Sequence, residues 1–330
     1  MLVRSLWGRK TVMGEPFKLY ASKETKATIP PADLKLLEKL LPVMDNFEMG
    51  MQAAKSATDA KAISQGFEMV LAQFQQVLRE AGVEPVTSDI TQPESLIAPA
   101  ASADAVVYAV QYHGADGLAV EGRALGGLID ALAGTNKPFV YTSGVWIYGN
   151  TGDAIADEDS QVNPTPLVAH RPQLERIVLD GVARGVRVTI VRPGNVYGHG
   201  GGIHMMWVQS AKSTGAARFV GDGTNHWAMV QLDDLAQLYV LALEKAAAGA
   251  IYNATDETSF TVREMAEAAS QGTGQNGAVT AWPLDDARLE LGAFADALAL
   301  DLRVNSNRAR QQLGWRTRTS TILDELRGTN

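Results

Sequence analysis

The chain contains no cysteine among its 330 residues. This absence excludes disulfide bonds, thiolate metal sites and cysteine nucleophiles, and it suits a reducing compartment, so we expect a cytoplasmic location. Long apolar runs are also missing. No segment approaches the roughly 20 apolar residues that span a bilayer, and the N-terminus lacks the continuous hydrophobic stretch of a signal peptide. The sequence therefore predicts a soluble protein without a membrane partner.

Positive charge is scarce as well. The chain has 29 Lys and Arg residues against 37 Asp and Glu residues, which gives a formal net charge of −8. Proteins that bind nucleic acid need a basic face or a basic segment, and no run of five like charges occurs here. We therefore expect no nucleic-acid partner.

The first 81 residues divide into two regions. Residues 1–33 show no clear period and end in IPPAD, which disfavours a helix. Residues 34–81 predict two amphipathic helices, because apolar residues recur at spacings of three and four on both sides of the polar SATDAK linker. Such a helical hairpin cannot bury both apolar faces alone, so it requires a second copy or another surface.

Residues 82–198 alternate short strands with helices. The β-branched segments DAVVYAV, KPFVYTS and VRVTIVRPGNVYG read as strands, and helices are expected at Val120–Leu132 and Gln173–Ala183. This rhythm predicts an α/β fold with a parallel, doubly wound, Rossmann-like sheet. Residues 199–330 are more irregular. A strand at AIYNAT and helices at 262–270 and 305–313 predict a small C-terminal lobe that contacts substrate.

Two glycine-rich segments are candidate anion sites. Gly272, Gly274 and Gly277 form a literal GxGxxG, but they follow a helix rather than a strand, so we interpret them as a loop. The triplet at residues 200–202 follows a predicted parallel strand, at the edge where ligands bind in open sheets. Its backbone N–H groups either cradle an anion or form a turn, and the sequence favours neither.

Polar residues near that triplet allow limited chemistry. His199 and His204 flank it without a carboxylate at a ligand-like spacing, so no metal site is expected. Asp233 and Asp234 form an adjacent pair that looks like an acid–base site, but we expect one of them to cap the following helix.

The motifs DAVVYAV, KPFVYTSGVWIYG, NPTPLVAHRPQLE, VRVTIVRPGNVYG and MVQLDDLAQLYVLALE together resemble atypical extended short-chain dehydrogenase/reductases, of the NAD-dependent epimerase/dehydratase type. The resemblance covers about residues 82–316 and implies an NAD or NADP cofactor. It implies these cofactor-binding residues: Asp89, Ile90, Ala109, Val110, Thr142, Ser143, Arg192 and Pro193. It implies these substrate-pocket residues: Gly144, Val145, Trp146, His170, Arg171, Gly194, Asn195 and Trp227.

The catalytic positions of that family are not retained. The family uses a Ser or Thr hydroxyl and a Tyr-x-x-x-Lys pair, and alignment puts Gly144, Val168 and Pro172 at these positions. None of these side chains moves a proton, so we name no catalytic residue and leave open an unorthodox role for His170 or Arg171. Trp227 stands where nucleotide-sugar enzymes of the family carry an arginine, which argues against a nucleotide-sugar substrate.

A second resemblance covers residues 34–86. LLPVMDNFEMG and the helices after it resemble the helical core of the GrpE cochaperones, which implies a homodimer or a contact with an Hsp70 through residues 34–81. The two resemblances meet at REAGVEPV, so the hairpin replaces the first βαβ unit and its phosphate-binding glycines. The strand expected at Glu84–Ile90 then either pairs directly with the strand at 104–110 or detaches.

Three hypotheses follow from these resemblances. The first is a reductase-family protein with weak or absent NAD(P) binding and no standard hydride transfer. The second is a GrpE-like interaction module, and the third is a chimeric gene product with no evolved function. A small-molecule ligand fits only the first.

Overall fold

The computed structural model describes residues 60–80, 86–112, 114, 116–317 and 320–328. It divides into two units, Met1–Thr87 and Ser88–Asn330. In the first unit, helix α4 spans Ala60–Glu80 and confirms the second helix of the predicted hairpin. The first helix of that hairpin and the irregular segment 1–33 lie outside the described residues.

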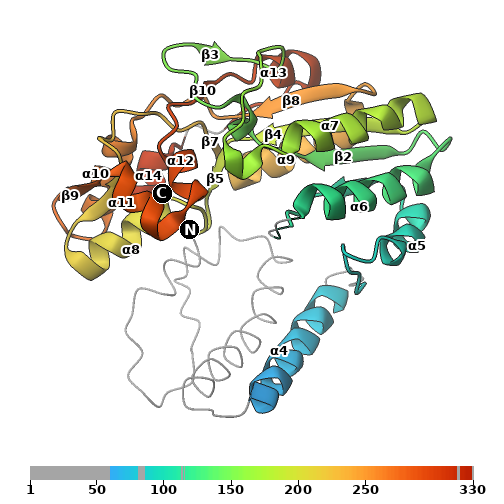
Figure 1. Cartoon of the computed structure of the whole chain (residues 1–330), viewed down its shortest axis with the longest axis horizontal. Coiled ribbons are helices and arrows are strands. Elements are labelled where there is room, and N and C mark those ends of the chain that lie inside the picture. The colour runs from blue at the N-terminus through green and yellow to red at the C-terminus, as the bar shows by residue number, and fades with distance from the viewer. Residues whose placement is uncertain (1–59, 81–85, 113, 115, 318–319, 329–330) are drawn as a thin grey trace, which may run out of the picture. The chain divides into compact units, whose positions relative to one another are not determined.

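A four-stranded parallel sheet forms the centre of the second unit (Figure 1). Its order is β1-β2-β4-β8, so neighbouring strands follow one another along the chain. The strands are β1 (Val106–Tyr108), β2 (Pro138–Thr142), β4 (Arg187–Pro193) and β8 (Ala250–Ala254). The predicted parallel α/β fold is thus confirmed. The AIYNAT strand, however, joins the main sheet as β8 instead of belonging only to the small lobe.

Helices cover both faces of this sheet. One core joins α5 (Glu94–Ser102), α6 (Gly117–Leu132) and α7 (Arg171–Asp180) to one face through side chains such as Leu125 and Phe139. The other core packs α9 (Leu232–Lys245) and α13 (Asn307–Leu313) on the opposite face. Because both faces are covered, the interior of β4 is buried at every residue from Val188 to Arg192 and not at alternate ones.

The strand expected at Glu84–Ile90 is not present in its described part. Residues 86–90 are irregular, and Asp89 begins a turn whose carboxylate accepts a hydrogen bond from the Thr91 backbone N–H at 2.9 Å. Helix α5 follows this turn. A strand is stable only with a hydrogen-bonded neighbour, and among the described residues the sheet ends at β1.

The remaining elements build a smaller lobe and its connections. The lobe core gathers apolar side chains of α8 (Met205–Thr214), β6 (Ala217–Val220), α10 (Val262–Gly272), β9 (Val279–Trp282) and α14 (Ile322–Arg327). The others are η1 (Val145–Tyr148), β3 (Ile155–Ala156), η2 (Pro166–Val168), η3 (Gly181–Arg184), β5 (Asn195–Tyr197), β7 (Met229–Gln231), α11 (Leu284–Leu291), α12 (Ala293–Leu298) and β10 (Arg303–Val304). Of the GxGxxG glycines, Gly272 ends α10, whereas Gly274 and Gly277 lie in the turn between α10 and β9, where a loop was predicted.

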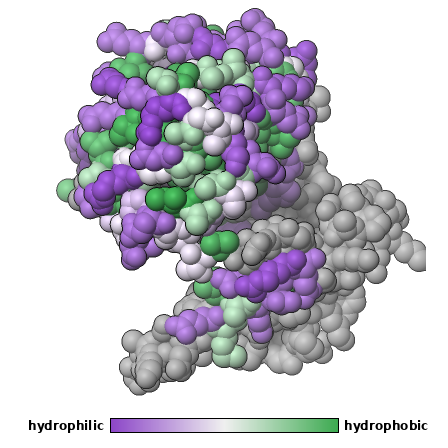
Figure 2. All heavy atoms as spheres, turned by 90° about the vertical axis from the view of Figure 1, so that its right-hand side faces the viewer, coloured by the Kyte–Doolittle hydropathy of each residue, from purple (hydrophilic) through white to green (hydrophobic). Residues whose placement is uncertain are grey.

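The surface of the second unit mixes residue types. Figure 2 presents one face of it, where hydrophilic residues are interspersed with hydrophobic ones. None of the helices in the described ranges is long and apolar enough to cross a membrane.

Candidate ligand-binding site

A cavity of about 300 Å³ opens where β2 and β4 end. In open α/β sheets ligands bind at the carboxyl ends of the strands, so this cavity is the first candidate site. Its lining comprises Gln111, Ser143, Gly144, Val145, Trp146, Val168, Arg171, Pro193, Gly194, Asn195, Val196, Gly202 and Ile203.

The end of β2 supplies the polar wall of this cavity. The Ser143 backbone N–H donates to the Val191 carbonyl at 2.8 Å, which continues the β2–β4 ladder one residue past the strand. The Ser143 hydroxyl is buried and has no partner among the described residues. The Thr142 hydroxyl instead lies 2.7 Å from the Tyr239 hydroxyl. Ser143 therefore retains a donor and an acceptor for a bound molecule.

Arg171 brings a positive charge into the cavity from the first turn of α7. The residue is 7% exposed, and its Nη1 donates to the Thr142 carbonyl at 2.9 Å and, more weakly, to the Tyr141 hydroxyl at 3.4 Å. No described carboxylate lies within 4.0 Å of its guanidinium. A buried charge without a counter-ion is costly, so this arginine is not placed there for stability alone.

Arg192 contrasts with it. Its Nε and Nη2 donate to the two Glu175 carboxylate oxygens at 2.9 and 2.6 Å, and its Nη1 donates to the Tyr148 hydroxyl at 2.8 Å. Burial alone would lower the pKa of Arg192, but the hydrogen bonds and charge of Glu175 raise it. Each nitrogen of this guanidinium makes a hydrogen bond, and Arg192 does not line the cavity.

Buried titratable groups lie close to Arg171 without lining the cavity. Glu121 on α6 is 0% exposed, and one of its oxygens accepts the Tyr112 backbone N–H at 3.0 Å. Burial, followed by the Glu121 charge, raises the pKa of Tyr108. Burial, followed by the Arg171 charge, lowers the pKa of His170, whose buried Nε2 has no partner in the described part of the chain.

The segment around the glycine triplet closes the other side. Gly202, at φ +122°, lines the cavity. Gly194 has a steric role, because a Cβ there would meet the Ala228 carbonyl at 2.6 Å. The expectation that Asp233 or Asp234 caps the next helix is wrong, since the Gln231 side chain accepts their backbone N–H groups.

His199 and Asp233 form a pair near that segment. His199 Nε2 lies 2.9 Å from an Asp233 carboxylate oxygen. No group of three or more His, Asp or Glu side chains suited to a metal ion occurs among the described residues.

The cavity gathers half of the residues that the resemblance implies. Those that line it are Ser143, Gly144, Val145, Trp146, Arg171, Pro193, Gly194 and Asn195. Those that do not are Asp89, Ile90, Ala109, Val110, Thr142, His170, Arg192 and Trp227. The implied cofactor-binding residues Asp89, Ile90, Ala109 and Val110 thus lie outside the cavity lining. Asp89 is exposed in its turn, where the hydrogen bonds from Thr91 lower its pKa.

Several lining residues escaped the sequence reasoning. Gln111 directly follows the predicted strand segment DAVVYAV, Val196 lies near the end of the predicted segment VRVTIVRPGNVYG, and Ile203 directly follows the glycine triplet. Their positions at or just after the ends of predicted strands were the signal that could have identified them. The sequence also did not identify Glu121, which lies in the expected helix Val120–Leu132. Its carboxylate is fully buried in the structure, which is unusual for a glutamate.

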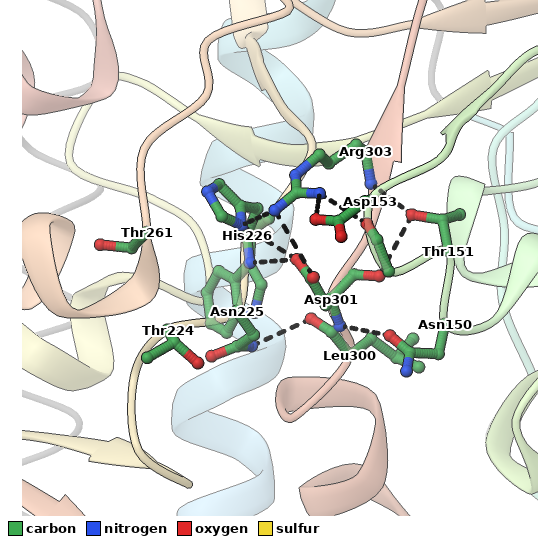
Figure 3. A network of polar contacts seen from close by, with 12 residues as sticks. Asn150, Thr151, Asp153, Thr224, Asn225, His226, Thr261, Leu300, Asp301 and Arg303 are labelled. Atoms are coloured by element: carbon green, nitrogen blue, oxygen red, sulfur yellow. Dashed lines mark hydrogen bonds and ion pairs between the residues drawn. The ribbon is translucent and has the colours of Figure 1, made fainter.

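Trp227 belongs to a second cavity, of about 370 Å³. Its ring stacks on Trp207 with centroids 4.9 Å apart, and its Nε1 donates to the Leu298 carbonyl. Beside it, Figure 3 shows Asp301 between His226 and Arg303, and Asp301 accepts the His226 backbone N–H at 2.8 Å.

The Arg303 guanidinium extends that network to a further loop. It donates to the Gly152 carbonyl at 2.7 Å and to Asp153 at 3.0 Å. The network therefore fastens the segment before and within β10 to the loops at 150–153 and 225–226.

These features define a Rossmann-type α/β protein with a cavity at the ends of its strands. The chain belongs to the NAD dependent epimerase/dehydratase family, whose model matches residues 64–255. The GrpE family model matches residues 9–93. The two matches overlap, which supports the junction predicted at residues 79–86.

Individual relatives agree with both assignments. An uncharacterized protein of Schizosaccharomyces pombe is 30% identical over 257 residues, covering 76% of this chain and 85% of its own. The structure of the dTDP-glucose 4,6-dehydratase DesIV from Streptomyces venezuelae, with NAD and TYD bound, superposes with a TM-score of 0.66. It is 21% identical and covers 78% of this chain and 81% of its own, so it shows the shared fold.

The GrpE match is shorter. The GrpE protein of Geobacillus thermodenitrificans is 38% identical over 72 residues, which is 22% of this chain and 33% of that protein. The chain therefore spans about a third of this GrpE relative.

Proposed function

We propose that this protein binds a small ligand in the cleft at the ends of β2 and β4, with NAD or NADP bound weakly or not at all, and that it carries out no standard hydride transfer. The observation that carries the proposal is the combination of a cavity at the strand ends, whose mostly apolar lining includes Ser143, Arg171 and Asn195, with proton-inert residues at the family's catalytic positions.

The argument for weak dinucleotide binding rests on the strand order. In doubly wound sheets the dinucleotide binds where the strand order reverses, and its pyrophosphate sits on a glycine loop at a helix N-terminus. The described strands run β1-β2-β4-β8 without a reversal. The segment where the glycine loop belongs instead matches GrpE.

The argument against hydride transfer rests on proton chemistry. The family mechanism needs a tyrosine whose pKa is lowered by a neighbouring lysine. Val168, at the tyrosine position, is buried and lines the cavity with an apolar side chain. The pKa of each of the seven described tyrosines is raised, in most of them chiefly by burial. None of them is prepared to act as an acid–base group near neutral pH.

Calorimetric titration of the full chain with NAD(H) and NADP(H) tests the proposal. We expect dissociation constants in the millimolar range or no binding, and no change in NADH absorbance with carbonyl compounds. Any binding in the cleft should weaken in Ser143→Ala. It should be unchanged in Ser160→Ala, whose hydroxyl lies in an exposed turn with Asp157. Micromolar binding with substrate-dependent NADH oxidation would contradict it.

A second candidate function concerns the first unit. The GrpE match supports a role for residues 34–81 in dimerisation or in contact with an Hsp70. Helix α4 carries large apolar side chains that are well exposed, among them Met69 (68%) and Leu71 (54%). Exposed apolar residues of this kind mark partner surfaces.

Nucleotide release from an Hsp70, followed with a fluorescent ADP analogue, tests this candidate. We expect the full chain to accelerate release, and the double variant Met69→Lys/Leu71→Lys to lose that effect. Equal release rates with and without the chain, together with a monomeric mass in analytical ultracentrifugation, would exclude both forms of the role.

A further inference from the structure

Arg171 is a buried cation that the described part of the protein leaves without an ionic partner. Its Nη1 makes the two hydrogen bonds to Thr142 and Tyr141, whereas Nε and Nη2 make none with the described residues. Burying a charge without a counter-ion costs several kcal/mol. The other buried arginine of the described residues, Arg192 on β4, differs in this respect, because the Glu175 carboxylate neutralises its charge through two hydrogen bonds.

Two acidic groups lie nearby, and neither pairs with Arg171. Glu175 pairs with Arg192, and Glu121 accepts a backbone N–H from Tyr112 through one oxygen, whereas its other oxygen has no partner among the described residues. Neither carboxylate comes within 4.0 Å of the Arg171 guanidinium. The cavity lining contains no aspartate or glutamate, and Arg171 is its charged residue. A protein with a net charge of −8 thus presents a locally positive cavity.

Neutral polar groups and an apolar wall complete the cavity. The buried Ser143 hydroxyl has no described partner, and Asn195 lines the same space. Val145 and Trp146 supply part of the apolar wall. A guanidinium that keeps free N–H donors binds carboxylate and phosphate oxygens in a bidentate manner.

We propose that this cavity takes a small carboxylate- or phosphate-bearing molecule whose anionic group pairs with Arg171 and accepts a hydrogen bond from Ser143. The inference rests on the proposed ligand-binding role of the cleft and names the chemical class of its ligand. It does not require that a dinucleotide binds.

The test uses the full chain and two probes, sodium pyruvate for carboxylates and inorganic phosphate for phosphate groups. Each is titrated by calorimetry and by thermal shift, against sodium chloride at equal ionic strength. We expect saturable binding of at least one probe, weakened about tenfold or more in Arg171→Gln because a charge-assisted hydrogen-bond pair is lost. The matched control is Arg288→Gln, which removes an exposed arginine paired with Asp285 and Asp296.

A structural role for Arg171 makes a different prediction for the unliganded protein. Removal of an uncompensated buried charge should leave the melting temperature unchanged or raised, whereas removal of a structural ion pair should lower it. Wild-type anion affinity in Arg171→Gln, or a wild-type response to both probes no larger than that to chloride, would overturn the inference.

If Arg171→Gln does not fold, Arg171→Lys and Ser143→Ala replace it. Both should weaken anion binding, and wild-type affinity in both overturns the inference. NAD(H) is titrated in parallel to keep the two proposals apart. Dinucleotide binding without anion binding overturns the anion site alone, and anion binding without dinucleotide binding supports it.

Discussion

The bidentate pair of Arg192 and Glu175 joins β4 to α7 inside the second unit. Both side chains are almost fully buried. Removal of one partner leaves an uncompensated charge in the interior, whereas removal of both leaves none. The resemblance implies a cofactor contact for Arg192, whereas the structure shows that it pairs with Glu175. The sequence could not predict this pair. Glu175 lies on the expected helix Gln173–Ala183, and no sequence spacing indicates which residue of a helix contacts which residue of a strand.

We expect Arg192→Met to lower the free energy of unfolding by about 3–5 kcal/mol. The double variant Arg192→Met/Glu175→Leu should recover most of this loss. Arg184→Gln, which breaks an exposed pair with Asp130, should cost less than about 1 kcal/mol and serves as the control. Urea unfolding measures all three. A double variant no more stable than the single one would show that the pair is not the cause.

His170 gives the second expectation at this scale. Burial, then the charge of Arg171, lowers its pKa in the folded protein below the 6.5 of an unfolded chain. As the pH falls through 6.5, the unfolded chain therefore takes up the proton first, and folding stability declines until the lowered folded pKa is reached.

His170→Gln should flatten this part of the pH profile and leave stability above pH 7 without a new slope. The check is the urea midpoint of both proteins at several pH values from neutral to mildly acidic. Parallel profiles for the two proteins would rule out the assignment.

At the scale of elements, the sequence predicted correctly those strands that pair with neighbouring strands and those helices that pack an apolar face on the core. The β-branched runs that became β2 and β4 pair on both edges, and the helices with clear apolar stripes became α6 and α10. The prediction of a strand at Glu84–Ile90 was wrong in its described part. A strand needs a hydrogen-bonded neighbour, and the local sequence does not show whether one is present. The lining residue Gln111 was missed because loops after strands carry little pattern.

A contrast between two helical glycines tests how α14 docks on α10. A Cβ at Gly272 would lie 1.9 Å from the Leu326 carbonyl, whereas a Cβ at Gly126 within α6 meets nothing within 4 Å. We expect Gly272→Ala to destabilise the protein by about 1–3 kcal/mol and Gly126→Ala to stabilise it by about 0.5–1 kcal/mol. Thermal unfolding of both variants gives the signs, and the same sign for both would contradict this packing.

At the scale of the whole molecule, the four hydrophobic cores of the described chain draw all their buried members from the second unit. No described residue of Met1–Thr87 belongs to any of them. The two resemblances predict a division, because the GrpE-like segment ends close to where the reductase-like pattern begins. They place the boundary at residue 82, whereas the two compact units meet between Thr87 and Ser88.

We therefore expect the fragment 88–330 to unfold in one cooperative transition with a midpoint close to that of the full chain's second unit. Differential scanning calorimetry compares the two. A fragment that binds a hydrophobic dye and melts without a transition would mean that the first unit completes its core.

The strand order has a consequence for how the protein forms during synthesis. Strand β2 pairs with β1, β4 with β2, and β8 with β4, so every strand of the sheet adds to one that has already left the ribosome. In a sheet with a reversed strand order, one edge of an early strand stays unpaired until a much later strand has been synthesised. Here the described strands of the sheet pair in chain order, and the first closure, between β1 and β2, spans only residues 109–137, so its entropy cost is smaller than that of a pairing at longer range. Growth in one direction along the chain is thus built into the topology.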